Sequence, residues 1–187
     1  ILKPVNKINR QQKGYQMMNF FYNSNQPGIV HESEIIQRIN SLNAAALDMI
    51  SLAPAEGLDL SKRAYQLSTS VEFQLDPYPK GVADALFNMS HFHLEQGDTM
   101  LALAQAKEAL QIYNELNKNL NQAATLRLLG MIYVQQNEYN KAMTSLLKAL
   151  ELARHLSDPR LLGEITMTMG QAYLASGELE TALTELK

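Results

Sequence analysis

Apolar residues recur at every third or fourth position along most of the chain, and this spacing predicts amphipathic α-helices. In the clearest stretch, one apolar stripe runs through Leu126, Leu129 and Tyr133, and a second runs from Ala142 to Ala153 beyond a polar break. No segment has the pattern of a β-strand, so the predicted fold class is all-α. The helices are predicted over residues 32–52, 55–74, 80–96, 99–117, 120–136, 139–156, 159–176 and 179–187.

The pattern repeats at intervals of 40 residues. Leu86, Leu126 and Thr166 are equivalent in three copies. Further equivalent sets are Met89, Leu129 and Met169; His93, Tyr133 and Tyr173; Gly97, Asn137 and Gly177; and Ala102, Ala142 and Ala182. Glycine and asparagine tolerate the left-handed backbone that ends many helices. A degenerate copy at residues 57–67 precedes them at a spacing of 45, so the sequence predicts tandem units of two helices each.

Small residues occupy matching places in the two helices of the best copy. Gly130 lowers helix stability by about 1 kcal/mol relative to alanine. This cost is acceptable if it lets the partner helix approach closely. We therefore expect Gly130 to lie against Ala142, where a larger side chain would clash.

These residues resemble the tetratricopeptide repeat family. The family pattern of Leu-Gly, a tyrosine three residues on, a turn residue and two spaced alanines is matched by Leu129, Gly130, Tyr133, Asn137, Ala142 and Ala149, and again by Met169, Gly170, Tyr173, Gly177 and Ala182. The resemblance is strong over residues 80–187 and weak over 32–79. It departs from the family at the usual aromatic position, at the closing proline, which is Arg154 here, and in its period, which is about 34 residues in the family. It implies a right-handed α–α superhelix of antiparallel helix pairs.

The repeats divide the chain into an N-terminal extension and a helical array. The predicted divisions are 1–29 for a basic and aromatic extension and 30–187 for the array, with units at 30–78 (degenerate), 79–118, 119–158 and 159–187 (truncated). The chain begins at Ile1 and stops inside its last predicted helix, so a fragment of a longer protein is expected.

The resemblance implies a non-catalytic protein-interaction module. By similarity to the family, first-helix residues line the concave face, and the corresponding residues here are Ile39, Leu42, Ala46, Met49, Phe87, His91, Leu94, Arg127, Met131, Val134, Met167, Gln171 and Leu174. Most are apolar, and the flexible thioethers adapt to varied partners. A protein or peptide segment is therefore the expected partner, with packing between repeats as the alternative role for these residues.

A second function is also compatible with the sequence. Units of this length are similar to those of bacterial regulators, including the amino-terminal regions of some cyclases and histidine kinases. The alternative is therefore a peptide- or ligand-sensing regulatory domain attached to a cyclase, a kinase or a transcription regulator. An open terminal repeat would leave apolar surface exposed, so a homodimer through terminal repeats is a further expectation.

Composition and charge exclude several partner classes. The chain has 16 Lys and Arg against 19 Asp and Glu, a formal charge of −3, which gives no general field for nucleic acid. Residues 1–31 are the exception, with four basic residues and no acidic one; a solvated tail is expected there, and an arm that contacts an acidic surface is the alternative. No apolar run is long enough to span a bilayer. With no cysteine, a reducing, cytoplasmic location is expected.

Catalytic, metal and cofactor sites are not expected. His91 and His93 are two residues apart, which directs them to different sides of a helix, whereas a zinc-binding helix uses a spacing of four. The sequence has no phosphate-binding glycine loop and no local signature of a nucleophilic triad. A carboxylate clamp of the kind found in chaperone-binding relatives is not expected either, because only Arg127 among the corresponding residues could serve it.

Overall fold

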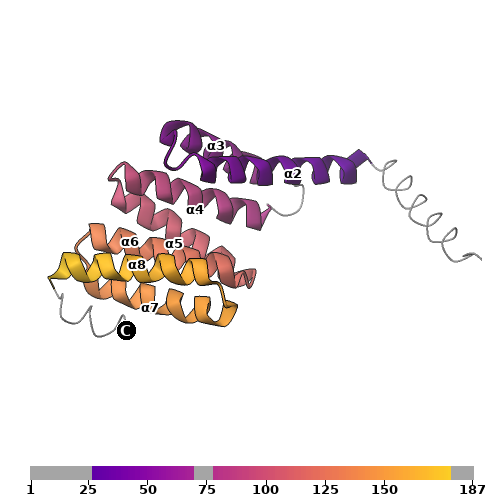
Figure 1. Cartoon of the computed structure of the whole chain (residues 1–187). Coiled ribbons are helices and arrows are strands. Elements are labelled where there is room, and N and C mark those ends of the chain that lie inside the picture. The colour runs from indigo at the N-terminus through magenta and orange to yellow at the C-terminus, as the bar shows by residue number, and fades with distance from the viewer. Residues whose placement is uncertain (1–26, 70–77, 178–187) are drawn as a thin grey trace, which may run out of the picture.

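The computed structural model describes residues 27–69 and 78–177, and within these ranges it contains α-helices and no β-strand. The helices are α2 (Pro27–Asp48), α3 (Pro54–Ser68), α4 (Pro79–Glu95), α5 (Thr99–Glu115), α6 (Asn119–Gln135), α7 (Tyr139–Leu156) and α8 (Pro159–Ser176). The all-α prediction is confirmed (Figure 1). The predicted helix at 179–187 and the end of the one predicted over 55–74 lie outside the described residues, and α2 begins and ends earlier than the predicted 32–52.

Local sequence signals explain where the helices begin and end. Proline occupies the first turn of α3, α4 and α8, where its missing N–H costs no hydrogen bond. The carboxylates of Asp98 and Asp158 cap α5 and α8 by accepting from the backbone N–H of Leu101 (3.1 Å) and Leu161 (3.0 Å). At or just past the helix ends, the backbone takes a positive φ at Gly97, Asn117, Asn137, Ser157 and Gly177, which are 20 residues apart. One helix with its turn thus takes 20 residues, and a pair takes 40.

The helices stack as successive pairs in one direction (Figure 1). Each helix contacts the next one along the chain, from α2 through α8. In the described ranges, α2 also contacts α4, α4 contacts α6 and α6 contacts α8, whereas α3, α5 and α7 do not contact one another. Because the even-numbered helices are the closer set, they form the inner layer of a curved stack, and the odd-numbered helices form the outer layer. We call the exposed side of α2, α4, α6 and α8 the inner surface.

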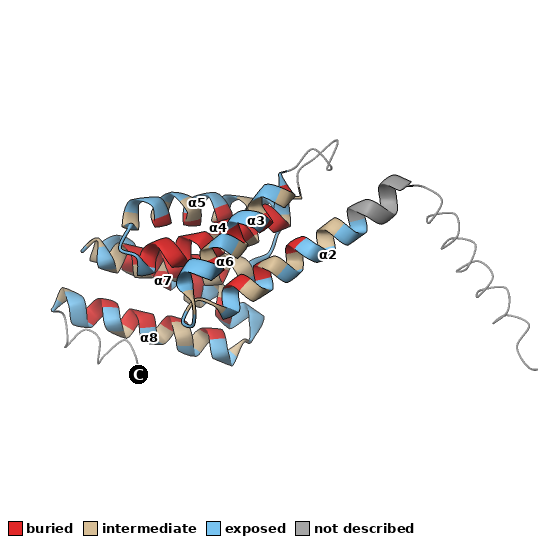
Figure 2. Cartoon of the chain, turned by 90° about the horizontal axis from the view of Figure 1, so that it is seen from above, coloured by how far each residue is buried: buried red, intermediate tan, exposed pale blue. Residues whose placement is uncertain are grey.

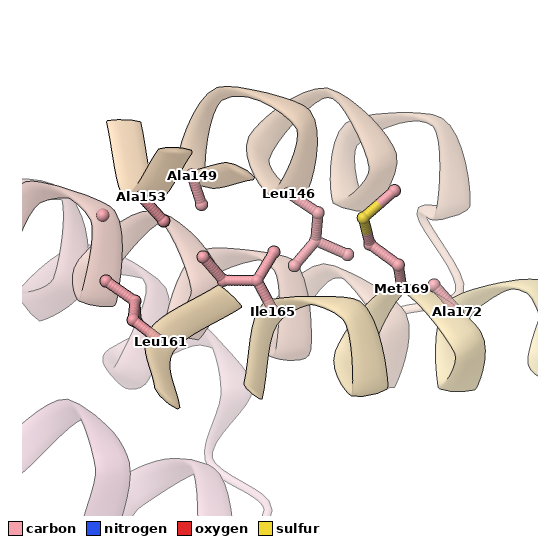
Figure 3. Close-up of a cluster of buried hydrophobic side chains, with 8 residues drawn as sticks. Leu146, Ala149, Ala153, Leu161, Ile165, Met169 and Ala172 are labelled. Carbon is pink, nitrogen blue, oxygen red and sulfur yellow. The ribbon is translucent and has the colours of Figure 1, made fainter. Parts of the chain in front are cut away.

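The buried side chains form a series of small clusters between neighbouring helices, as expected for a repeat array (Figure 2). In the cluster of Figure 3, Leu146 and Ala149 of α7 lie against Ile165 and Met169 of α8. The alanines at the repeated positions, Ala102, Ala109, Ala142 and Ala149, are fully buried, so they allow the helix backbones to approach each other closely.

The expected neighbour of Gly130 is wrong in its detail. A Cβ added to Gly130 would lie 2.6 Å from Cγ and 2.7 Å from Cδ2 of Leu146, so Leu146 fills the space left by the missing side chain, one turn beyond Ala142. In the preceding unit the equivalent residue is Ser90, which is buried and donates its hydroxyl to the carbonyl of Ala102 (2.8 Å). The position therefore accepts only a small side chain, although the reason is a leucine rather than the alanine.

Candidate functional site

The inner surface contains two hollows. The N-terminal hollow has a volume of about 330 Å³ and is lined by Asn40, Asn43, Ala44, Leu47, Lys80, Asp84, Phe87, Asn88, Tyr113 and Asn121. The C-terminal hollow has a volume of about 400 Å³ and is lined by Leu94, Glu95, Met131, Val134, Gln135, Thr168 and Gln171. The first lies mainly on α2 and α4, and the second lies on α4, α6 and α8.

The C-terminal hollow brings together four residues that the sequence predicted for the concave face, namely Leu94, Met131, Val134 and Gln171. Farther along α8, Met167 and Leu174 are 59% and 62% exposed. These two residues are one helical turn before and after Gln171, so they share its side of α8. This end of the inner surface is therefore apolar and accessible.

His91 lies on α4 one turn from each hollow, between Phe87 and Leu94. Its ring meets the Phe87 ring edge to face, with 5.1 Å between centroids, and the side chain is buried. Burial, and secondarily the charge of Arg127, lowers the pKa of His91 to about 4. His91 is thus a neutral packing residue at physiological pH, with little surface to offer a partner.

Arg127 is held by local contacts. Its Nη2 lies 3.4 Å from Oε2 of Glu164 on α8, and its Nη1 donates to Sδ of Met131 at 3.4 Å. Burial lowers the pKa of Arg127, and the neighbouring carboxylate of Glu164 opposes this effect. The side chain is only 16% exposed, so Arg127 links α6 to α8 rather than extending into solvent.

The four residues predicted from α2 and its end do not line either hollow. Ile39 and Ala46 are fully buried, and Leu42 packs against the cluster that Ile39 forms with α3 and α4. Met49 follows the end of α2, and its Cβ would be 2.9 Å from a Cβ added to Gly57 of α3. The concave-face prediction is therefore wrong for Ile39 and Ala46, and α2 instead lines the N-terminal hollow with Asn40, Asn43, Ala44 and Leu47.

The polar character of the N-terminal hollow was missed by the sequence analysis. Asp84 accepts hydrogen bonds from the Tyr113 hydroxyl (2.7 Å) and from Nζ of Lys80 (2.6 Å), and burial together with Asp84 raises the pKa of Tyr113. Nδ2 of Asn43 donates to the carbonyl of Gly81 (3.1 Å), and Nδ2 of Asn88 donates to the carbonyl of Asn43 (2.9 Å). Buried asparagines among apolar residues, such as Asn43 and Asn88, were the signal available in the sequence.

The other histidine on α4 has a structural contact as well. Nδ1 of His93 lies 2.7 Å from Oε1 of Gln105 on α5. Among the described residues, no group of three or more His, Asp or Glu side chains is arranged to hold a metal ion. In the same part of the chain, no helix has the length and apolar character needed to cross a membrane.

Comparison with known proteins agrees with this architecture. Residues 81–155, which extend from α4 to α7, match the tetratricopeptide repeat family. The chain belongs to the tetratricopeptide repeat family. Tetratricopeptide repeats are in general modules for protein–protein interaction, and the array described above has the stacked helix pairs of that family.

The similar curated proteins are all named tetratricopeptide repeat protein 29. The chain is 36% identical over 120 residues to the protein of Macaca fascicularis, covering 57% of this chain and 25% of the relative. It is 34% identical over 120 residues to the human protein and 28% identical over 130 residues to that of Trypanosoma brucei brucei, which covers 70% of this chain. The chain spans about a quarter of the length of these relatives. None of the three is bacterial, so the similarity to bacterial regulators stays a prediction.

Proposed function

We propose that the inner surface binds a segment of a partner protein, and that the C-terminal hollow is the main contact. The observation that carries this proposal is the continuity of the hollow with exposed apolar side chains. Leu94, Met131 and Val134 line the hollow, and Met167 and Leu174 extend the same apolar surface along α8. A partner that covered these side chains would remove them from water, which contributes about 1.5–3 kcal/mol for each Met or Leu that becomes fully buried.

The chemistry of the lining suggests an apolar or amphipathic segment. Glu95, Gln135 and Gln171 surround the apolar residues with polar groups, a pattern that resembles the polar rim of protein interfaces. The unbranched side chains of Met131 and Met167 adopt several rotamers and can adjust to segments of different shape. An apolar stripe on a partner helix, or alternate apolar residues on an extended strand, would fit such a surface.

Two exposed residues of the inner surface test the proposal. Peptides that bind the chain are first selected from a random display library, and their affinity is then measured by fluorescence anisotropy. We expect Met167→Asp and Leu174→Asp each to weaken the selected peptides by about tenfold or more, because a buried carboxylate would face apolar groups. Since both residues are largely exposed, helicity measured by circular dichroism should not change.

Matched controls come from the outer layer. Met100 of α5 is 72% exposed and Leu147 of α7 is 50% exposed, so Met100→Asp and Leu147→Asp make the same chemical changes on the opposite side of the array. We expect these variants to bind the selected peptides within about twofold of the parent chain. Loss of binding in the outer-layer variants alone would move the site to that side and refute the proposal.

A further inference from the structure

We propose that the N-terminal hollow is a second subsite that binds a neutral primary amide, as carried by an asparagine or glutamine side chain of a partner segment. The biological setting rests on the proposed function, since the subsite lies on the same inner surface. The chemistry of the hollow is independent of the apolar contacts at the other end, so it can be tested separately.

The main evidence is an unused hydrogen-bond acceptor. Asn43 is 4% exposed and lines the hollow. Its Nδ2 donates to the carbonyl of Gly81 at 3.1 Å, which determines which end of the amide is which. Among the described residues its Oδ1, which is buried, has no hydrogen-bond partner. A buried oxygen without a donor carries a desolvation cost, which an N–H group of a ligand in the hollow would remove.

Charge balance in the hollow indicates a neutral donor. Asp84 already accepts from the Tyr113 hydroxyl and forms an ion pair with Lys80, in which Nζ and Oδ2 are 2.6 Å apart. A ligand ammonium group would leave one positive charge in excess in a partly buried site, and a ligand carboxylate would face Oδ1 of Asn43 and the carboxylate of Asp84. An amide adds no charge.

The remaining lining matches the other parts of such a ligand. An amide carbonyl needs a donor, and Lys80 and Asn121 both bring N–H groups to the wall of the hollow. Ala44, Leu47 and Phe87 supply apolar surface for the methylene groups that precede the amide. The hollow therefore offers an acceptor, donors and an apolar wall within one volume of about 330 Å³.

Three small molecules with the same carbon chain test the chemical class directly. Propionamide, propylammonium and propionate are titrated separately into the isotope-labelled 187-residue chain, and the side-chain amide resonances of Asn43 and Asn88 are followed by NMR. We expect saturable shifts with propionamide, and affinities at least tenfold weaker for the two charged molecules. Preference for propylammonium, or the absence of any saturable shift with propionamide, would overturn the proposal.

Variants separate a specific subsite from non-specific binding. Asn43→Leu removes the acceptor at similar size and should abolish the propionamide shifts of the Asn88 resonance, whereas Met131→Ala in the C-terminal hollow should leave them unchanged. Because Asn43→Leu also removes the bond to Gly81 and could disturb folding, Lys80→Met provides a second test. Lys80 is 41% exposed, so its removal should preserve the fold and should shift selectivity at least tenfold from propionamide toward propylammonium, since Asp84 would then lack its cation.

The results are distinguishable from those for the proposed function. If selected peptides bind at Met167 and Leu174 while propionamide fails to bind, the amide subsite is refuted and the partner-binding function remains supported. Unchanged selectivity in Lys80→Met would refute the charge-balance argument and with it the preference for a neutral ligand.

Discussion

Replacing Gly130 by alanine tests the close packing on which the repeat geometry depends. Gly130 lies inside α6 and is buried, and Leu146 of α7 fills the space beside it. Alanine normally stabilises a helix interior relative to glycine by about 1 kcal/mol. The packing in this structure predicts the opposite sign at this position.

The magnitude follows from two opposing effects. The added Cβ would lie 2.6 Å from Cγ of Leu146, whereas carbon atoms in ordinary contact are about 3.5–4.0 Å apart. One of the two helices must therefore move by about 1 Å, and Leu146 has no free space because it is fully buried between α6, α7 and α8. Overpacking of this kind costs about 1–3 kcal/mol, so after the helix-propensity gain we expect Gly130→Ala to lower the free energy of unfolding by about 0–2 kcal/mol.

A double-mutant cycle makes this prediction sharp. Leu146→Ala alone should cost about 2–5 kcal/mol, because it leaves a cavity. In that background the clash is absent, so Gly130→Ala should raise stability by about 1 kcal/mol. The free energies are obtained from urea unfolding of all four proteins followed by circular dichroism, and the coupling between the two sites should be about 1–3 kcal/mol.

A helical glycine on the surface provides the control. Gly163 of α8 is exposed, and an added Cβ would meet none of the described residues within 4 Å. Gly163→Ala should therefore stabilise the chain by up to about 1 kcal/mol. If Gly130→Ala stabilises the chain as much as Gly163→Ala, and if the cycle shows no coupling to Leu146, the packing argument is refuted.

Two further predictions concern pH and a helix end. Because the pKa of His91 is about 4 in the folded chain and 6.5 in the unfolded chain, the unfolded chain takes up the proton first as the pH falls; stability is therefore full above pH 6.5 and decreases toward pH 4 by about 3 kcal/mol. His91→Met, which introduces the residue found at the matching position in α6, should remove this slope in urea unfolding measured across that pH range, and equal slopes in both proteins would contradict it. Ser157 has a φ of 53°, so Ser157→Gly should raise the urea midpoint, by up to about 1 kcal/mol of stability, and a lower midpoint would show that the serine is not strained.

The helical array could be predicted from the sequence because its signals recur. The starts of α4, α6 and α8 are 40 residues apart, and the same is true of α5 and α7. Three copies of each position average out local irregularities, so the register was correct even where the residue differed, as at Ser90, Gly130 and Gly170. The shorter spacing of 20 residues was missed because two of its five left-handed positions, Asn117 and Ser157, have no glycine.

The part of the site on α6 and α8 could be predicted for the same reason. Met131, Val134 and Gln171 line the C-terminal hollow, and Leu174 is exposed beside it, because the family positions carry over without a shift from one 40-residue unit to the next. What the sequence could not indicate is which of these residues are buried. His91 occupies the same register as Met131 and Gln171, but Phe87 packs against its ring and leaves it 8% exposed.

The error in α2 has a different physical origin. The apolar residues Ile35, Ile39, Leu42 and Ala46 are spaced by three or four and form one stripe, and that stripe faces α3 and α4. The inner surface lies one residue farther along, at Asn40, Asn43 and Leu47, and one residue corresponds to a rotation of about 100° around a helix. In α6, Ile132 faces the core and the neighbouring Met131 faces the hollow, so an apolar side chain is found on both sides of that boundary. In α2 the surface stripe is polar, and apolar character identifies the core alone. The binding surface of such a helix should therefore be sought among the polar residues beside its apolar stripe, which is where the unpartnered oxygen of Asn43 is found.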